Sequence, residues 1–225
     1  MTTLQTISTA FQAGGLWMWA ILAIQVASIV IIIERSYALY LRRRPNQKRL
    51  VSVFESDIKQ GQLATAIGRA QELGSYSVAK AVKAGAQAAA DMGGRDEIQS
   101  RMDEILLHEN SQLEKRTGFL AMLGNVGTLL GLLGTIVGLI QAFASVANTN
   151  PVEKAALLTQ GIALAMNTTA YGLIAAIPAL VAYAILQNRA NLLADDLNQA
   201  ALRAFNWLSY SYDSIPKRAV RTKKG

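Results

Sequence analysis

The chain has 225 residues, of which 52% are hydrophobic and 16% are charged, and its formal net charge is +7. This share of apolar residues is high for a water-soluble protein and, together with a positive mean hydropathy, indicates a membrane protein. The chain contains no cysteine, which excludes disulfide bonds and thiolate metal sites. The positive charge requires no nucleic acid partner, because basic residues beside a membrane span bind anionic lipid headgroups.

Three long stretches lack charged side chains, and each contains an apolar run long enough to cross the ~30 Å hydrocarbon core of a bilayer. They predict three transmembrane helices, at residues 15–37, 118–146 and 160–187. The first run also resembles a secretory signal peptide. It has no basic residues before it and continues into Glu34 and Arg35 without a small-residue cleavage pattern, so we expect a retained helix.

Basic residues are distributed unevenly around these spans. Fourteen of the 22 lysines and arginines lie in residues 34–116 and seven in residues 189–225, whereas Lys154 lies alone between the second and third spans. Cytoplasmic connections carry the excess of basic residues in membrane proteins. We therefore expect the long first connection and the C-terminus in the cytoplasm, and the N-terminus on the opposite side.

The connection between the first two spans has a helical, amphipathic pattern. No proline separates its last helix from the second span, so we expect one continuous helix from about residue 96 to residue 146. The third span continues inward in the same way, and a basic tail follows from Pro216.

The predicted fold class is therefore an all-α membrane protein with three transmembrane helices, the second and third extended as long helices into a cytoplasmic helical bundle. The predicted parts are a periplasmic N-terminus 1–14, the first span 15–37, a cytoplasmic helical domain 38–117, the second span 118–146, a periplasmic loop 147–159, the third span 160–187, and a cytoplasmic helix with a basic tail 188–225.

Five glycines of the second span recur every three or four positions, and this average of 3.5 residues places them in one stripe along a helix. Glycine destabilises an isolated helix, but it allows membrane helices to approach each other closely. We therefore predict a helix-packing role for these glycines and for two glycines of the third span. The residues are Gly124, Gly127, Gly131, Gly134, Gly138, Gly161 and Gly172.

Hydroxyl and amide side chains accompany the glycines. Thr135 and Thr169 lie among small residues near the predicted bilayer centre, which favours a functional role. For Thr128 we favour the simpler interpretation, in which a membrane threonine bonds to a carbonyl of its own helix. Asn167 costs more to bury than a threonine and needs a partner. The candidate pore-lining residues are Thr128, Thr135, Asn167, Thr168 and Thr169.

The second and third predicted spans contain no Asp, Glu, Lys, Arg or His, and the first has only Glu34 and Arg35 at its inner end, although ion and proton paths normally use such a residue. Either the chain does not conduct protons, or a partner chain supplies the acid. His108, the only histidine, has no second ligand at metal spacing. We predict no metal site and no cofactor and, without a nucleophile and base pair, no enzymatic activity.

Two motifs resemble the MotA/TolQ/ExbB family of ion-driven stator subunits: residues 129–143, LLGLLGTIVGLIQAF, and residues 161–179, GIALAMNTTAYGLIAAIPA. The resemblance implies a homopentamer of this subunit around a dimer of a single-span ExbD/TolR-like protein, whose membrane aspartate faces Thr135 and Thr169. It also implies a multi-pass protein of the bacterial inner membrane with a periplasmic N-terminus and a cytoplasmic C-terminus. It leaves open a TonB/TolA-like protein as a further partner.

One position departs from the family pattern. Many ExbB-like and TolQ-like members have a glutamate in the third-span motif (GIAEAL), whereas this chain has Leu164. The role of that glutamate is not transferred to this chain.

The function that we expect is an ion-channel and motor subunit that uses the proton motive force to energise envelope processes such as TonB-dependent transport. The alternatives are a Tol–Pal or gliding-type motor and a passive membrane scaffold. A transporter acting alone is disfavoured, because the spans contain no inverted repeat and no charge within the membrane beyond Glu34 and Arg35 at the inner end of the first. Protons are the usual ion of the family, and sodium is the alternative.

Overall fold

The computed structural model describes residues 15–42, 47–147 and 150–212, and every regular element in them is a helix. The predicted N-terminal segment 1–14 and the basic tail from Pro216 lie outside the described residues. The helices are α2 (Gly15–Ser36), the π-helix η1 (Tyr37–Arg42), α3 (Gln47–Val51), the 3₁₀ helix η2 (Ser52–Phe54), α4 (Glu55–Lys59), α5 (Leu63–Glu72), α6 (Ser77–Ala90), α7 (Arg95–Glu114), α8 (Thr117–Ser145) and α9 (Pro151–Tyr212).

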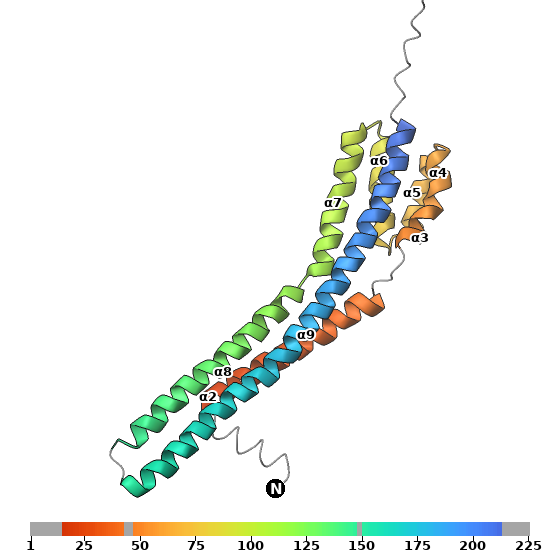
Figure 1. Ribbon diagram of the computed structural model, residues 1–225. Coiled ribbons are helices and arrows are strands. Elements are labelled where there is room, and N and C mark those ends of the chain that lie inside the picture. The colour runs from red at the N-terminus through yellow and green to blue at the C-terminus, as the bar shows by residue number, and fades with distance from the viewer. Residues whose placement is uncertain (1–14, 43–46, 148–149, 213–225) are drawn as a thin grey trace, which may run out of the picture. The chain divides into compact units, whose positions relative to one another are not determined.

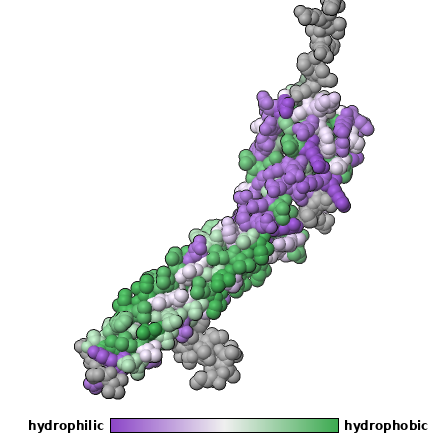
Figure 2. All heavy atoms as spheres, viewed as in Figure 1, coloured by the Kyte–Doolittle hydropathy of each residue, from purple (hydrophilic) through white to green (hydrophobic). Residues whose placement is uncertain are grey.

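The chain folds into two compact units. A membrane unit contains α2, α8 and α9 up to Asn188, and these helices run side by side (Figure 1). A polar unit contains α3 to α7 and the part of α9 from Arg189 onward. Figure 2 shows mostly hydrophobic side chains over the first unit and mostly hydrophilic ones over the second. This difference is the one expected for a part in lipid and a part in water.

Three helical segments are long and apolar enough to cross a membrane. They are Gly15–Leu41, Arg95–Ser145 and Glu153–Tyr210. The predicted class, an all-α membrane protein with three spans and long second and third helices, is confirmed.

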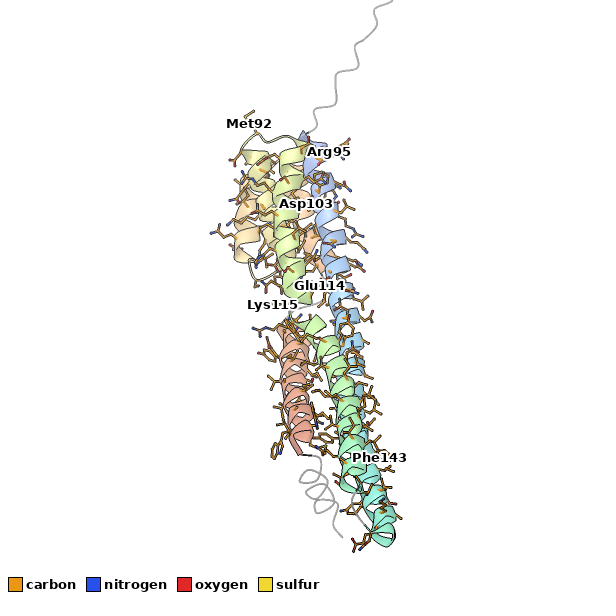
Figure 3. All side chains as sticks on the ribbon, turned by 90° about the vertical axis from the view of Figure 1, so that its left-hand side faces the viewer. Met92, Arg95, Asp103, Glu114, Lys115 and Phe143 are labelled. Atoms are coloured by element: carbon orange, nitrogen blue, oxygen red, sulfur yellow. The ribbon has the colours of Figure 1, made fainter. Side chains whose placement is uncertain are left out.

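The expected continuous helix from residue 96 to residue 146 is wrong in one detail, because it is interrupted between α7 and α8. Arg116 has a positive φ of 62°, the left-handed conformation, which ends the regular helix at Glu114 (Figure 3). Its guanidinium forms two hydrogen bonds with the Glu34 carboxylate of α2, 2.6 and 2.8 Å long. This ion pair offsets part of the conformational strain at Arg116. No pattern in the local sequence predicts the break.

Helix α9 is continuous over 62 residues and contains Pro178. It begins at Pro151, a favourable residue in a first helical turn because it has no N–H to leave unpaired. Residues 151–159, which the sequence places in a periplasmic loop, are therefore helical.

The glycine stripe of α8 packs directly on α9. A Cβ atom at Gly172 would lie 2.8 Å from Gly131 Cα and 2.9 Å from the Gly127 carbonyl oxygen, both of them backbone atoms. A Cβ at Gly131 would lie 3.1 Å from Gly172 Cα. The two helices thus cross with backbone against backbone at this point, which no residue larger than glycine allows.

The other glycines continue this contact in both directions. Gly138 faces Ala165 and Gly161 faces Ala142, while Gly124 faces the Leu180 side chain. Helix α2 covers one side of the pair, with Ile24 near Gly127 and Trp17 near Gly134.

The polar unit is built around α6. Most of its alanines are buried, and Gly85 lies so close to Met102 of α7 and Leu208 of α9 that a Cβ there would meet Met102 Sδ at 2.6 Å. Small residues let the neighbouring helices approach α6 on several sides. The largest fully buried side chains of this core are Val51, Phe54, Ile58, Val78, Val82, Ile98, Met102, Leu197 and Leu208.

One carboxylate is buried in this unit. Glu109 of α7 is 3% exposed and accepts hydrogen bonds from Ser77 Oγ at 2.6 Å and Lys80 Nζ at 2.8 Å. Both donors lie in the first turn of α6. A carboxylate near a helix N-terminus is also stabilised by the helix dipole. Glu109 therefore fixes α7 against the start of α6.

We predict that Glu109→Ala lowers the free energy of unfolding by about 2 kcal/mol, because hydrogen bonds to a buried charged group are lost. The thermal midpoint of the purified protein measures the effect. Glu104→Ala is the matched control, since Glu104 is exposed on the same helix. Equal midpoints for the two variants would contradict the prediction.

We predict that Gly172→Ala destabilises the membrane unit by about 1–3 kcal/mol, because backbone atoms rather than flexible side chains must move. The loss is measured by heating the protein in detergent and monitoring the folded fraction by size-exclusion chromatography. Gly118→Ala in α8 should leave stability unchanged, since nothing lies within 4 Å of a Cβ there.

Candidate ion path in the membrane unit

Two threonine hydroxyls meet where α8 crosses α9. Thr135 Oγ1 is hydrogen-bonded to Thr169 Oγ1. It also lies 3.2 Å from the Gly131 carbonyl oxygen and 3.1 Å from the Ala165 carbonyl oxygen. Thr169 Oγ1 lies 3.1 Å from the Gly131 carbonyl oxygen of the other helix. The close glycine contact brings these groups within reach of each other.

This hydroxyl pair has more acceptors than protons. Each hydroxyl carries one proton and can accept two, whereas each carbonyl only accepts. The two protons can therefore be arranged in different ways among Gly131, Ala165 and the two oxygens. Such a pair can donate to an ionised carboxylate and can accept from a protonated one. It cannot itself bind or release a proton near neutral pH.

The pair lies on the side of the α8–α9 contact opposite α2. Thr135 follows Gly134, which faces Trp17 of α2, and a step of one residue is a turn of about 100° around the helix. On α9, Tyr171 bonds to α2, and Thr169 is two residues away, about 200° around the axis. Helix α2 thus leaves the Thr135–Thr169 side uncovered, as far as the described residues extend.

The remaining candidate residues lie apart from this pair. Thr168 is 3% exposed, packs against Gly134 and donates to the Leu164 carbonyl of its own helix at 3.3 Å. Thr128 is exposed and donates to the Gly124 carbonyl at 3.2 Å. Asn167 is exposed, and within the described residues it forms no hydrogen bond.

The consecutive polar residues 167–169 therefore point in three directions. The pair brings together Thr135 and Thr169, whereas Asn167 lies about 160° away from Thr169 around α9.

A polar contact that the sequence analysis did not find links α2 to α9. Tyr171 donates its hydroxyl proton to Gln25 Oε1 at 2.9 Å, within two membrane segments. The available signal was Gln25 itself, because an amide inside an apolar span must find a partner. The contact fixes how α2 lies against α9.

Leu164 lines a cavity of about 530 Å³ on the α2 side of the α8–α9 contact. Its polar lining comes from Gln141, Ser145, Gln160 and Thr168, and Trp17 of α2 contributes an aromatic wall. The leucine that replaces the glutamate of the resembled family thus lies beside polar groups. Among the described residues, no cluster of three or more His, Cys, Asp or Glu side chains is placed to hold a metal ion.

Three apolar helices of membrane-spanning length, packed through a glycine contact, together with a hydroxyl pair and no acidic or basic side chain where α8 crosses α9, are the features of a membrane protein of the all-α class. Residues 75–199 match the family described as the MotA/TolQ/ExbB proton channel family. This match covers more than half of the chain, and the chain belongs to that family.

Two relatives support the assignment at different levels. A protein of Methanothermobacter thermautotrophicus described as an ExbB homolog in biopolymer transport is 25% identical over 208 residues, which are 90% of this chain and 70% of that protein. The solved structure of Campylobacter jejuni MotAB matches with a TM-score of 0.62 and 16% identity, over 92% of this chain and 86% of that one. The second likeness shows the fold alone.

We predict that Tyr171→Phe lowers the stability of the membrane unit by about 0.5–1.5 kcal/mol, the range found for hydrogen bonds between membrane helices. Thermal unfolding in lipid nanodiscs measures the loss. Combining it with Gln25→Leu should add little further loss, because the same bond is already broken. Tyr183→Phe on the same helix is the control, since Tyr183 forms no hydrogen bond within the described residues. Strictly additive losses would contradict a direct bond.

Proposed function

We propose that this chain is the channel and motor subunit of an inner-membrane complex that uses the proton motive force to do mechanical work. The observation that carries the proposal is the Thr135–Thr169 hydroxyl pair, which joins two spans that contain no Asp, Glu, Lys, Arg or His. Such a pair can serve a carboxylate in both of its protonation states. It therefore suits a path in which a partner chain supplies the acid.

The partner is a single-span ExbD/TolR-like or MotB-like protein with an aspartate in its span. Family membership supports a partner of this kind. The side of α8 and α9 that α2 leaves uncovered is the surface on which its aspartate would face Thr135 and Thr169. We propose the family arrangement, a homopentamer of this chain around a dimer of the partner.

The topology follows from the basic residues. The polar unit lies in the cytoplasm, the N-terminus in the periplasm, and α2, α8 and α9 cross the inner membrane. One proton crossing a potential of ~100 mV releases about 2.3 kcal/mol, so several transfers can drive a mechanical cycle. The driven process is envelope transport of the TonB-dependent type, with a TonB/TolA-like protein as the recipient of the work. Tol–Pal and gliding motors use the same chemistry.

We predict that Thr135→Val and Thr169→Val each reduce ion flux at least about tenfold, because a hydrogen bond to a charged group contributes about 1.5–3 kcal/mol. Valine keeps the shape of threonine, so assembly should persist. Flux is measured as dissipation of a pH gradient in vesicles that contain this chain and its partner, with sodium absent and then added.

The control is Thr159→Val, because the Thr159 hydroxyl only bonds to the Ala155 carbonyl of its own helix. Full flux in the Thr135 and Thr169 double variant would refute the assignment. Envelope activity that survives a collapsed ion gradient would instead favour a passive scaffold, for which the extensive glycine packing alone would account.

A further inference from the structure

Asn125 is a polar residue of α8 that does not belong to the Thr135–Thr169 pair. It lies in the apolar span, its side chain is exposed, and within the described residues it forms no hydrogen bond. An amide exposed to hydrocarbon without a partner costs several kcal/mol, on the order of 4 kcal/mol or more against an alkane. In the membrane, water or a polar group of another chain must therefore satisfy it.

Asn125 lies on the same side of α8 as Thr135. The positions 125, 128, 132 and 135 are separated by three, four and three residues, which places them in one lane along a helix. Thr128, also exposed, belongs to this lane, and the 52%-exposed Leu132 is its only large apolar member. We call residues Asn125, Thr128, Leu132 and Thr135 the α8 lane. Val126, by contrast, lies about 100° from Asn125 and about 180° from Thr135 around α8, so it belongs to a different face.

The α8 lane leads from the hydroxyl pair toward the end of α8 that adjoins Arg116. Ten residues separate Asn125 from Thr135, a rise of about 15 Å, or half of a bilayer core. On α9 the same side carries Leu173 and Leu180 over this distance. The polar groups thus come from α8 alone, and they have no polar counterpart on α9.

We propose that Asn125 and Thr128 line a water-accessible inner half of the ion path, which connects the Thr135–Thr169 pair to the cytoplasm, with Leu132 as an apolar constriction below the pair. The inference rests on the proposed function. It adds Asn125 to the residues of the ion path and states that this half of the path opens to the cytoplasm. Water along the α8 lane would provide the hydrogen-bond partners that the Asn125 amide needs. Leu132 separates this water from the hydroxyl pair, because apolar constrictions disfavour a continuous column of water.

The absence of cysteine makes the lane directly testable. Single variants Asn125→Cys, Thr128→Cys and, as the control outside the lane, Val126→Cys are produced with the partner in otherwise native membranes. Val126 is exposed (37%) and adjoins Asn125 in the helix, so depth in the membrane is matched. Inverted vesicles are treated with a cationic, membrane-impermeant methanethiosulfonate, and labelling is followed by mass shift. The reagent needs a hydrated thiolate.

Asn125→Cys and Thr128→Cys should react at least about tenfold faster than Val126→Cys, since a thiol in lipid has a raised pKa and little thiolate. Labelling from the periplasmic side should be slow, because the pair and Leu132 intervene. Equal, slow labelling of all three positions overturns the proposed water path and indicates that Asn125 is buried against another chain. Fast labelling at Val126 as well also overturns it.

Failure of this inference is distinguishable from failure of the proposed function. If Thr135→Val abolishes flux while Asn125→Cys stays unlabelled, the motor assignment stands and the water lane is refuted. If Asn125→Cys is labelled while the Thr135 and Thr169 double variant conducts normally, the lane stands and the role of the pair is refuted. Thr128→Cys provides the same readout should the Asn125 variant fail to assemble.

Discussion

The close approach of α8 and α9 at Gly131 and Gly172 is the constraint on which the membrane unit depends. Backbone atoms meet there, so the rotation of each helix about its axis is fixed within narrow limits. That rotation decides which side chains enter the contact, which face α2 and which remain exposed. The Thr135–Thr169 pair exists because the carbonyl of Gly131 and the hydroxyl of Thr169 are brought within 3.1 Å. A larger residue at either glycine would separate the helices and remove this geometry.

Under the proposed function, a helix crossing that offers hydroxyls and no carboxylate has a physical advantage. A buried carboxylate in each subunit would require a large desolvation free energy or would stay protonated. Hydroxyls avoid that penalty, since the carbonyls of Gly131 and Ala165 satisfy them when no acid is present. They remain able to bond a carboxylate that arrives on another chain. The subunit can thus be stable alone and still depend on its partner for ion transfer.

Much of this architecture follows from residue spacing. The 3.5-residue period of the glycines predicts the α8 face that packs, because period and helix geometry are directly linked. Adjacent residues are less informative: Asn167, Thr168 and Thr169 suggest a polar cluster, yet successive side chains differ by about 100° around a helix. Only contacts with α2 and α8 decide which of them reaches Thr135. The break at Arg116 depends on Glu34, a residue 82 positions away, and no local pattern contains it.

The polar groups above and below the hydroxyl pair lie on different sides of the α8–α9 contact. Gln141, Ser145 and Gln160 line the cavity on the α2 side, whereas Asn125 and Thr128 lie on the opposite side of α8, nearer to Arg116. The packed backbones at Gly131 and Gly172 separate the two regions. An open pore through one subunit would dissipate the gradient without work. Under the proposed function, this offset disfavours a continuous column of water, and a partner carboxylate that moved between the two regions would couple conduction to motion of the partner.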